Sequence, residues 1–327
     1  MTVSIIIPVK PGGEVRALDS LRCLECPQVD FELLIAEGSC PSRQRNQAAR
    51  QAEGDILYFL DDDSLVSPGF LQQALIHFAD PSVAVVGGPS LTPATDSLRQ
   101  RAFGAAFASP FGGGGVRSRY MRVGKARRTD DSGLILCNLA FRRRIFLDKG
   151  GFDERLYPNE ENELMERIGD SGLAMVHDPD LAVMRSQRPT FRAFVRQMLN
   201  YGRGRGQQTR ISGKVRWSAF APALFLVYLA ILPCFAGPVF SLPLLAYILL
   251  TIIFAIQGGI ASRNPLLGGM LLLVLPMLHL CYGAGIFRGL LGKLPTSAPA
   301  GASVNIRHLK KFGAPWIDCT AKSRGVS

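Results

Sequence analysis

A stretch of 46 residues without a charged side chain, Trp217 to Ser262, constrains the fold of this chain more than any other feature. A transmembrane helix needs about 20 apolar residues, so the stretch is long enough for two crossings. Gly237, Pro238 and Pro243 interrupt it and predict a helical hairpin in the membrane. The alternative is a large buried helical core, but soluble cores rarely contain so long a run without a charge.

A second uncharged stretch, Asn264 to Phe287, is long enough for another crossing. Basic residues precede the first stretch and dominate the tail after the second. Three crossings would place the basic tail on the outer side, against the tendency of positive residues to stay in the cytoplasm. We therefore expect one apolar segment to be re-entrant or interfacial. Pro276, Gly283 and Gly285 interrupt the last segment and make it the best candidate.

The charges divide the chain into two physical parts. Of the 26 acidic residues, 25 lie between Glu14 and Asp180, and the last is Asp318. Met1 leads directly into an apolar strand, without the pattern of a signal peptide. We expect a multi-pass protein of the inner (cytoplasmic) membrane with its globular domain in the cytoplasm, and no nucleic-acid partner, because the basic patch lacks interleaved aromatic residues. The predicted divisions are a globular domain (1–195), a basic juxtamembrane segment (196–216), a membrane domain of two to three apolar helices (217–290) and a basic tail (291–327).

Strand and helix patterns alternate in the globular domain. The predicted strands cover residues 3–9, 31–36, 56–60 and 83–86, and the predicted helices cover 14–24, 42–52, 68–78 and 160–169. This alternation predicts an α/β domain with a mostly parallel sheet and helices on both faces. Ligands of such sheets bind beyond the carboxyl ends of the strands.

Three carboxylates, Asp61, Asp62 and Asp63, follow the third predicted strand directly. Adjacent negative charges repel one another, and hard oxygen ligands of this kind suit Mg²⁺ or Mn²⁺, which in turn bind diphosphates. The alternative is an acidic turn in which Asp63 caps the next helix. Glu37 ends the second strand and could accept hydrogen bonds from a ribose or a base. Neither a P-loop nor a G-x-G-x-x-G pattern follows the first strand, which excludes those two nucleotide sites.

Two further carboxylates, Glu160 and Glu161, begin a predicted helix, where the helix dipole favours ionised acids. A carboxylate held there can act as a base, although helix N-termini are also enriched in Glu without any catalysis. The four glycines at 112–115 predict a flexible loop. Cys23 and Cys26 have the spacing of a metal or redox pair, but a helix end and loop fits them better.

Several motifs together resemble glycosyltransferase family 2. The nucleotide-sugar half is matched by Ile-Pro-Val-Lys ending at Lys10, Glu-Gly-Ser from Glu37, the run 43–49 and the stretch 54–63. The acceptor half is matched by runs at 138–143, 150–154 and 159–164. The resemblance covers about residues 1–205. Runs at 197–205 and 279–285 are similar to membrane-attached members of the succinoglycan glucosyltransferase type, which build bacterial exopolysaccharides.

The resemblance implies a GT-A fold and an inverting, metal-dependent transfer from a nucleotide diphosphate sugar, with a UDP-sugar as the expected donor and a lipid-linked saccharide as the expected acceptor. It assigns Asp61 to the nucleoside and to the metal, Asp63 to the metal, and Glu161, with Glu160 beside it, to the base position. The remaining assignments are donor binding for Pro8, Lys10, Glu37, Arg45 and Asp62, and the acceptor or membrane side for Gln197, Tyr201, Arg203 and Arg205.

The chain departs from the family pattern in three places. Glu37 and Glu161 replace the commoner Asp, so each reaches one methylene further. Asn200 and Tyr201 stand where processive synthases carry Arg and Trp, which argues against synthesis of a long polymer. Two alternative functions fit the same sequence: a polyprenyl-phosphate sugar synthase, and an inactive membrane adaptor with a basic surface.

Overall fold

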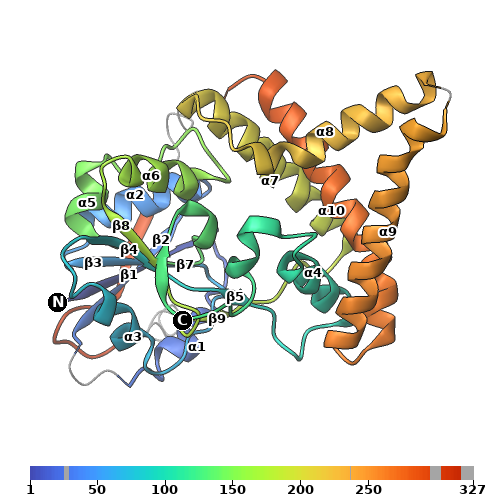
Figure 1. Ribbon diagram of the computed structural model, residues 1–327. Helices are drawn as coiled ribbons and strands as arrows, with labels where there is room; N and C mark the ends of the chain where they lie inside the picture. The colour runs from blue at the N-terminus through green and yellow to red at the C-terminus, as the bar shows by residue number, and fades with distance from the viewer. Residues whose placement is uncertain (26–28, 236, 295–302, 318–327) are drawn as a thin grey trace, which may run out of the picture.

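An eight-stranded mixed sheet forms the centre of the globular domain in the computed structural model, which describes residues 1–25, 29–235, 237–294 and 303–317 (Figure 1). In spatial order its strands are β10 (Asn305–Lys310), β2 (Phe31–Glu37), β1 (Val3–Val9), β3 (Ile56–Leu60), β7 (Asn138–Arg142), β4 (Val83–Gly87), β8 (Ala174–His177) and β6 (Arg127–Thr129). β1 pairs in parallel with β2 and β3, and β4 pairs in parallel with β8. β10, β7 and β6 run antiparallel to their neighbours, so the predicted α/β class is confirmed with a sheet of mixed direction. A second sheet pairs β5 (Ser90–Leu91) with β9 (Val183–Met184).

Helices cover both faces of the large sheet, as the continuous apolar strands predict. On one face α1 (Ala17–Leu21) and α3 (Phe70–His77) bury apolar side chains against the strands. On the other face lie α2 (Pro41–Gln51), α5 (Arg143–Asp148) and α6 (Glu160–Gly169). The first helix is shorter than the predicted 14–24, because only Ala17 and Leu21 of this helix are buried.

A third apolar core joins the globular domain to the C-terminal helices. It contains α4 (Leu98–Ala108) and α7 (Phe191–Ser212), with Phe103 and Phe194 stacked at 4.2 Å between ring centroids. The glycines at 112–115 were predicted to form a flexible loop, and this is wrong for the first two. A Cβ at Gly112 would lie 2.2 Å from the carbonyl oxygen of Ala106, so this backbone packs directly on α4 before a short 3-10 helix (Gly114–Arg119).

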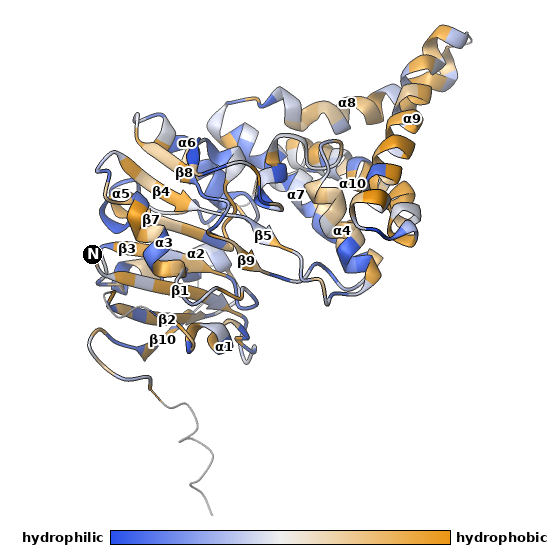
Figure 2. Ribbon diagram, turned by 60° about the horizontal axis from the view of Figure 1, so that its bottom comes forward, coloured by the Kyte–Doolittle hydropathy of each residue, from blue (hydrophilic) through white to orange (hydrophobic). Residues whose placement is uncertain are grey.

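Three apolar helices follow: α8 (Trp217–Ile231), α9 (Pro238–Ala261) and α10 (Pro265–Leu291). A 3-10 turn, Leu232–Cys234, extends α8, and all three segments are long and apolar enough to cross a membrane. They lie together on one flank of the molecule, away from the sheet (Figure 2). The long helix α7 spans the predicted boundary at 195–196, so most of the basic juxtamembrane segment is helical.

Part of the basic tail returns to the globular domain. β10 pairs antiparallel with β2, with Asn305 opposite Glu37, and Leu309 is buried in the core beside the strands. The segment 305–310 therefore belongs to the sheet, although the sequence predicted it as part of a separate tail. Cys26 of the Cys23–Cys26 pair lies outside the described residues, and Cys23 is exposed with a free thiol.

Candidate active site

Two arginines hold the carboxylates at the end of β3. Arg45 donates from Nη2 to Asp61 Oδ1 at 2.9 Å, and Arg185 Nη2 lies 3.1 Å from Asp61 Oδ2. Arg185 also donates from Nε to Asp63 Oδ1 at 2.6 Å, so it bridges the first and third carboxylates of the triplet. Burial alone would raise the pKa of Asp61, but Arg185 and Arg45 outweigh it and hold that pKa below its usual value.

Asp62 behaves differently from its two neighbours. Partial burial raises the pKa of Asp62, and the negative charges of Asp63 and Asp61 raise it further. Its backbone carbonyl accepts a hydrogen bond from the Ala17 N–H at 3.0 Å, which ties the triplet to the start of α1. The repulsion expected from three adjacent carboxylates is therefore present, and the arginines relieve it for Asp61 and Asp63.

Arg45 connects the triplet to the carboxylate pair on α6. This side chain extends from α2 and is almost fully buried, and its Nη1 lies 3.1 Å from Glu160 Oε1. Burial, then the charge of Glu161, raises the pKa of Glu160 to about 8. Glu160 Oε2 is buried without a hydrogen-bond partner, whereas Glu161 Oε1 accepts from Asn162 Nδ2 at 3.1 Å. The two acids thus have different environments, and Glu160 is the one that retains a proton near neutral pH.

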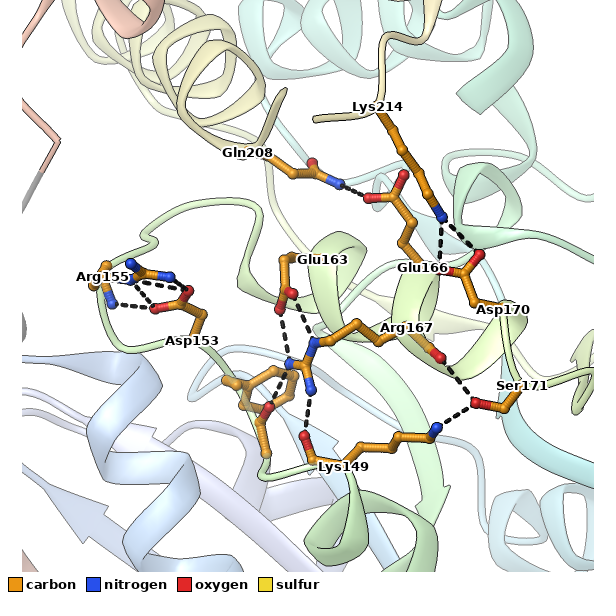
Figure 3. Close-up of polar contacts among 12 residues, drawn as sticks. Lys149, Asp153, Arg155, Glu163, Glu166, Arg167, Asp170, Ser171, Gln208 and Lys214 are labelled. Carbon is orange, nitrogen blue, oxygen red and sulfur yellow. Dashed lines mark hydrogen bonds and ion pairs between the residues drawn. The ribbon is translucent and has the colours of Figure 1, made fainter. Parts of the chain in front are cut away.

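The helix α6 is tied to the Gly-Gly-Phe turn before it, and that turn is tied to α2. Arg167 pairs with Glu163 one helical turn earlier and donates to the carbonyl oxygen of Gly151 at 2.8 Å (Figure 3). Asn46 on α2 bonds both the N–H and the carbonyl of Phe152, at 2.9 and 2.8 Å. Gly151 has φ +72°, and a Cβ there would lie 2.6 Å from Asn46 Oδ1. The Gly-Gly-Phe run therefore positions the carboxylate helix against the donor side of the domain.

The ends of β1 and β2 form the next part of this edge. The two strands are in register, with Val9 opposite Glu37, so their carboxyl ends meet beside the end of β3. Glu37 accepts a hydrogen bond from the Gly12 N–H at 2.7 Å and so holds the loop after β1. Pro8 lies within β1, and Lys10 is exposed just beyond it.

The four candidate residues on α7 divide into two groups. Gln197 donates from Nε2 to the Tyr201 hydroxyl at 3.0 Å. Arg203 donates to the carbonyl oxygen of Tyr157, and buried Arg205 donates to Gln208, each at 3.0 Å. Gln197 and Tyr201 are thus paired with each other along the helix, while both arginines are engaged within the fold.

Arg185 is the functional residue that the sequence did not reveal. It lies in the segment after β9, 122 residues beyond Asp63 in the chain. No motif surrounds it, and the only available signal was the need for cations near three adjacent carboxylates. Arg16 adds a weaker contact, at 4.0 Å from Asp63 and largely exposed.

The donor set at the end of β3 fits a hard divalent cation. Within the described ranges, no group of three or more His, Cys, Asp or Glu side chains gathers closely enough to hold a metal by itself. However, Mg²⁺ on a nucleotide typically takes one or two protein carboxylates, with phosphates and water completing its shell. Asp61 and Asp63 meet this requirement, and Arg185 is the cation with which a metal would compete.

Comparison with known proteins identifies the family. The profile of glycosyl transferase family group 2 matches residues 56–261, more than half of the chain. The pre-mycofactocin glycosyltransferase of Mycobacterium tuberculosis (strain CDC 1551 / Oshkosh) is 26% identical over 221 residues, which cover 61% of this chain and 46% of that protein. The same protein from a second strain gives the same values. The chain spans about half the length of the curated relatives it matches.

The likeness in fold is shown by the first of two solved structures. The mannosyltransferase PcManGT from Pyrobaculum calidifontis, solved with GDP-Man and Mn²⁺, has a TM-score of 0.55 at 14% identity, covering 89% of this chain and 87% of that one. TarS of S. aureus, in a structure of residues 1–349 with UDP, has a TM-score of 0.43 at 15% identity, covering 97% of this chain and 98% of that one. From the sequence profile, which matches more than half of its length, we conclude that the chain belongs to glycosyl transferase family group 2.

Proposed function

We propose that this protein transfers a sugar from a nucleotide diphosphate sugar to a lipid-linked saccharide acceptor, with inversion at the anomeric carbon. One observation carries the proposal: the contacts Arg185–Asp61–Arg45–Glu160 connect the acidic end of β3 to the carboxylate pair of α6. A donor-binding edge and a base-bearing helix are thereby held next to each other. Family membership supports the same reaction class, and it leaves the inactive adaptor without support.

On the donor side, Asp63 and Asp61 would hold Mg²⁺ or Mn²⁺ against the diphosphate. When bound, the ion neutralises charge that develops on the leaving nucleoside diphosphate. Glu37, at the end of β2, is placed to contact the ribose or base, and we take UDP as the nucleotide on the strength of the family resemblance. Arg185 supplies a fixed positive charge beside the same carboxylates.

On the acceptor side, Glu161 acts as the base. Burial, then the charge of Glu161, raises the pKa of Glu160 to about 8, which makes Glu160 the less suitable base of the pair, so we assign that role to Glu161. The acceptor hydroxyl oxygen attacks the anomeric carbon, its proton passes to Glu161, and the bond from that carbon to the phosphate oxygen breaks with its electron pair. A single displacement inverts the configuration, giving a β-linkage from an α-linked donor.

The membrane part gives the acceptor a place to bind. A lipid-linked sugar would present its hydroxyl at the membrane surface, and three helices long and apolar enough to cross a membrane support a position of the globular domain there. We propose an inner-membrane location with the catalytic domain in the cytoplasm and a role in the synthesis of a bacterial polysaccharide or glycolipid.

The test is transfer by the full chain in detergent against a panel of nucleotide sugars, with and without Mn²⁺. Glu161→Gln should lower turnover by at least about a hundredfold, which is the usual contribution of a positioned acid or base. Asp63→Asn should also lower turnover strongly, because it removes a carboxylate that would hold the metal ion. Asp148→Asn removes an exposed carboxylate on α5 and should leave turnover unchanged. Full turnover by both site variants would refute the mechanism. Loss with Asp63→Asn but not with Glu161→Gln would instead indicate a phosphate acceptor, which needs no base, as in a polyprenyl-phosphate sugar synthase.

A further inference from the structure

The β10 strand fixes the side of the membrane on which the tail lies. It is hydrogen-bonded to β2, which pairs with β1 in the same sheet. The tail and the globular domain therefore lie on the same side of the membrane. Only residues 295–302 separate the end of the α10 region from the described part of the tail. The nine Cα–Cα steps from Leu294 to Ser303 reach at most about 32 Å, which is less than the ~40–45 Å of a bilayer with its headgroups. The C-terminal end of α10 must therefore lie on that face too.

The beginning of the apolar part lies on this face as well. The helix before it, α7, packs on the globular domain, with Gly204 against the carbonyl oxygen of Pro158 and Arg203 bonded to Tyr157. The chain thus enters and leaves its apolar part on the same side. Such a chain crosses the bilayer an even number of times, so three crossings are excluded.

The helix α10 is the one that stays at the surface. It packs on α4 and on α7 of the globular domain, and Leu267 and Leu271 in its first half belong to the apolar core that also contains α4. A Cβ at Gly285 would lie 2.3 Å from the carbonyl oxygen of Leu199, so α10 and α7 are in close contact there. In the most apolar segment of α10, 44% of the residues are buried, against 6% in the segment that contains α8 and 11% in α9. Both halves of α10 are thus attached to the globular domain.

The charges agree with this arrangement. Basic residues stand where the chain meets the domain face, at Arg216 before α8, at Arg263 between α9 and α10, and at Arg288 and Lys293 at the end of α10. The α8–α9 turn carries no charged residue, and the two helices meet at a tip that points away from the sheet (Figure 1). Cations favour the cytoplasmic headgroup region, and an uncharged tip favours the lipid interior.

We propose that the apolar part docks on a lipid bilayer from one side only, with the α8–α9 hairpin inserted in the lipid and α10 lying along the membrane surface. The exposed apolar side chains of the hairpin, among them Leu224, Val239, Leu245 and Ile256, are the surface that lipid covers. A bilayer, rather than a protein, is the partner because these side chains surround both helices. The inference is independent of the sugar chemistry proposed above.

The test compares the two ends of α10. In a full-length chain whose cysteines are replaced by serine, single cysteines are introduced as Arg263→Cys and Lys293→Cys, both at exposed positions. Natural Cys23, restored alone, marks the face of the globular domain. Each chain is treated with a membrane-impermeant maleimide in right-side-out and in inside-out vesicles.

The expected result is that all three cysteines react in the same vesicle orientation, by at least about tenfold over the other. Labelling of Lys293→Cys only from the face opposite to Cys23 would overturn the proposal, because it requires an odd number of crossings. Labelling of Arg263→Cys from that opposite face, or only after detergent, would also overturn it, because α10 would then begin across or within the lipid. Ser262→Cys and Leu291→Cys repeat the comparison if either first variant is not recovered in membranes.

Discussion

The proton held by Glu160 leads to a measurable dependence of stability on pH. This side chain is 1% exposed, and its raised pKa means that the folded state binds a proton that the unfolded state releases. Between pH 4.5 and about 8 the unfolded chain is therefore favoured progressively as the pH rises. Glu160→Gln removes the ionisable group and keeps an oxygen that can accept from Arg45. We expect the variant to lose less stability than the wild type over this range.

The size of the effect follows from the difference between the two states. A pKa raised from 4.5 to about 8 corresponds to a ceiling of about 5 kcal/mol, at about 1.4 kcal/mol per pH unit. Arg45 can rearrange to pair with the ionised form, so a realistic gain at pH 8 is about 2 kcal/mol, or roughly 4 °C in Tm. Near pH 4.5 the difference in Tm should be smallest within this range, because Glu160 is then protonated in the folded state and about half protonated in the unfolded state.

The assay is thermal unfolding of the full chain in detergent at half-unit steps from pH 4.5 to 8.5. Glu14→Gln, which neutralises an exposed carboxylate, serves as the matched control and should follow the wild-type curve. Parallel curves for wild type and Glu160→Gln would show that Glu160 does not retain its proton. The choice of Glu161 over Glu160 as the base would then lose its basis.

Three further predictions concern single side chains. Arg185→Gln should tighten Mn²⁺ binding without nucleotide by about tenfold, because a competing cation is removed. The same variant should weaken the binding of a nucleoside diphosphate. Calorimetric titration measures both affinities, and an unchanged Mn²⁺ affinity would contradict the competition. Gly151→Ala should lower the free energy of unfolding by about 2 kcal/mol more than Gly150→Ala does, since both glycines have positive φ but only Gly151 is crowded. Equal Tm values for the two variants would contradict this. Gly285→Ala should lower Tm, whereas Gly269→Ala, with open space on the same helix, should leave it unchanged or raise it.

Local patterns in the sequence predicted the donor edge well. The buried strand that ends in Asp61 is a short-range feature, and its partner strands follow from the same alternation of apolar runs. Arg185 could not be predicted, because it reaches the triplet through a long-range contact that only the folded chain creates. β10 could not be predicted from periodicity, because its apolar residues Ile306 and Leu309 are three positions apart rather than two, and a shift of register between His308 and Lys310 accommodates that spacing. Part of the positive charge that the sequence assigns to a basic tail is therefore carried by a strand of the sheet.

The glycines of α7 contact two different parts of the molecule. Gly204 touches the turn that precedes Glu160, while Gly202 and Gly206 touch the backbone of α10 on the opposite side of the helix. A larger side chain at any of the three would push apart the carboxylate-bearing helix and the helix that we place on the membrane surface. These close contacts fix the separation of α6 and α10, and the assignment of Arg203 and Arg205 to the acceptor side stays a prediction. If the proposed transfer to a lipid-linked hydroxyl is right, it would depend on that separation, because the hydroxyl would have to lie within hydrogen-bond reach of Glu161 while its anchor stays in the bilayer.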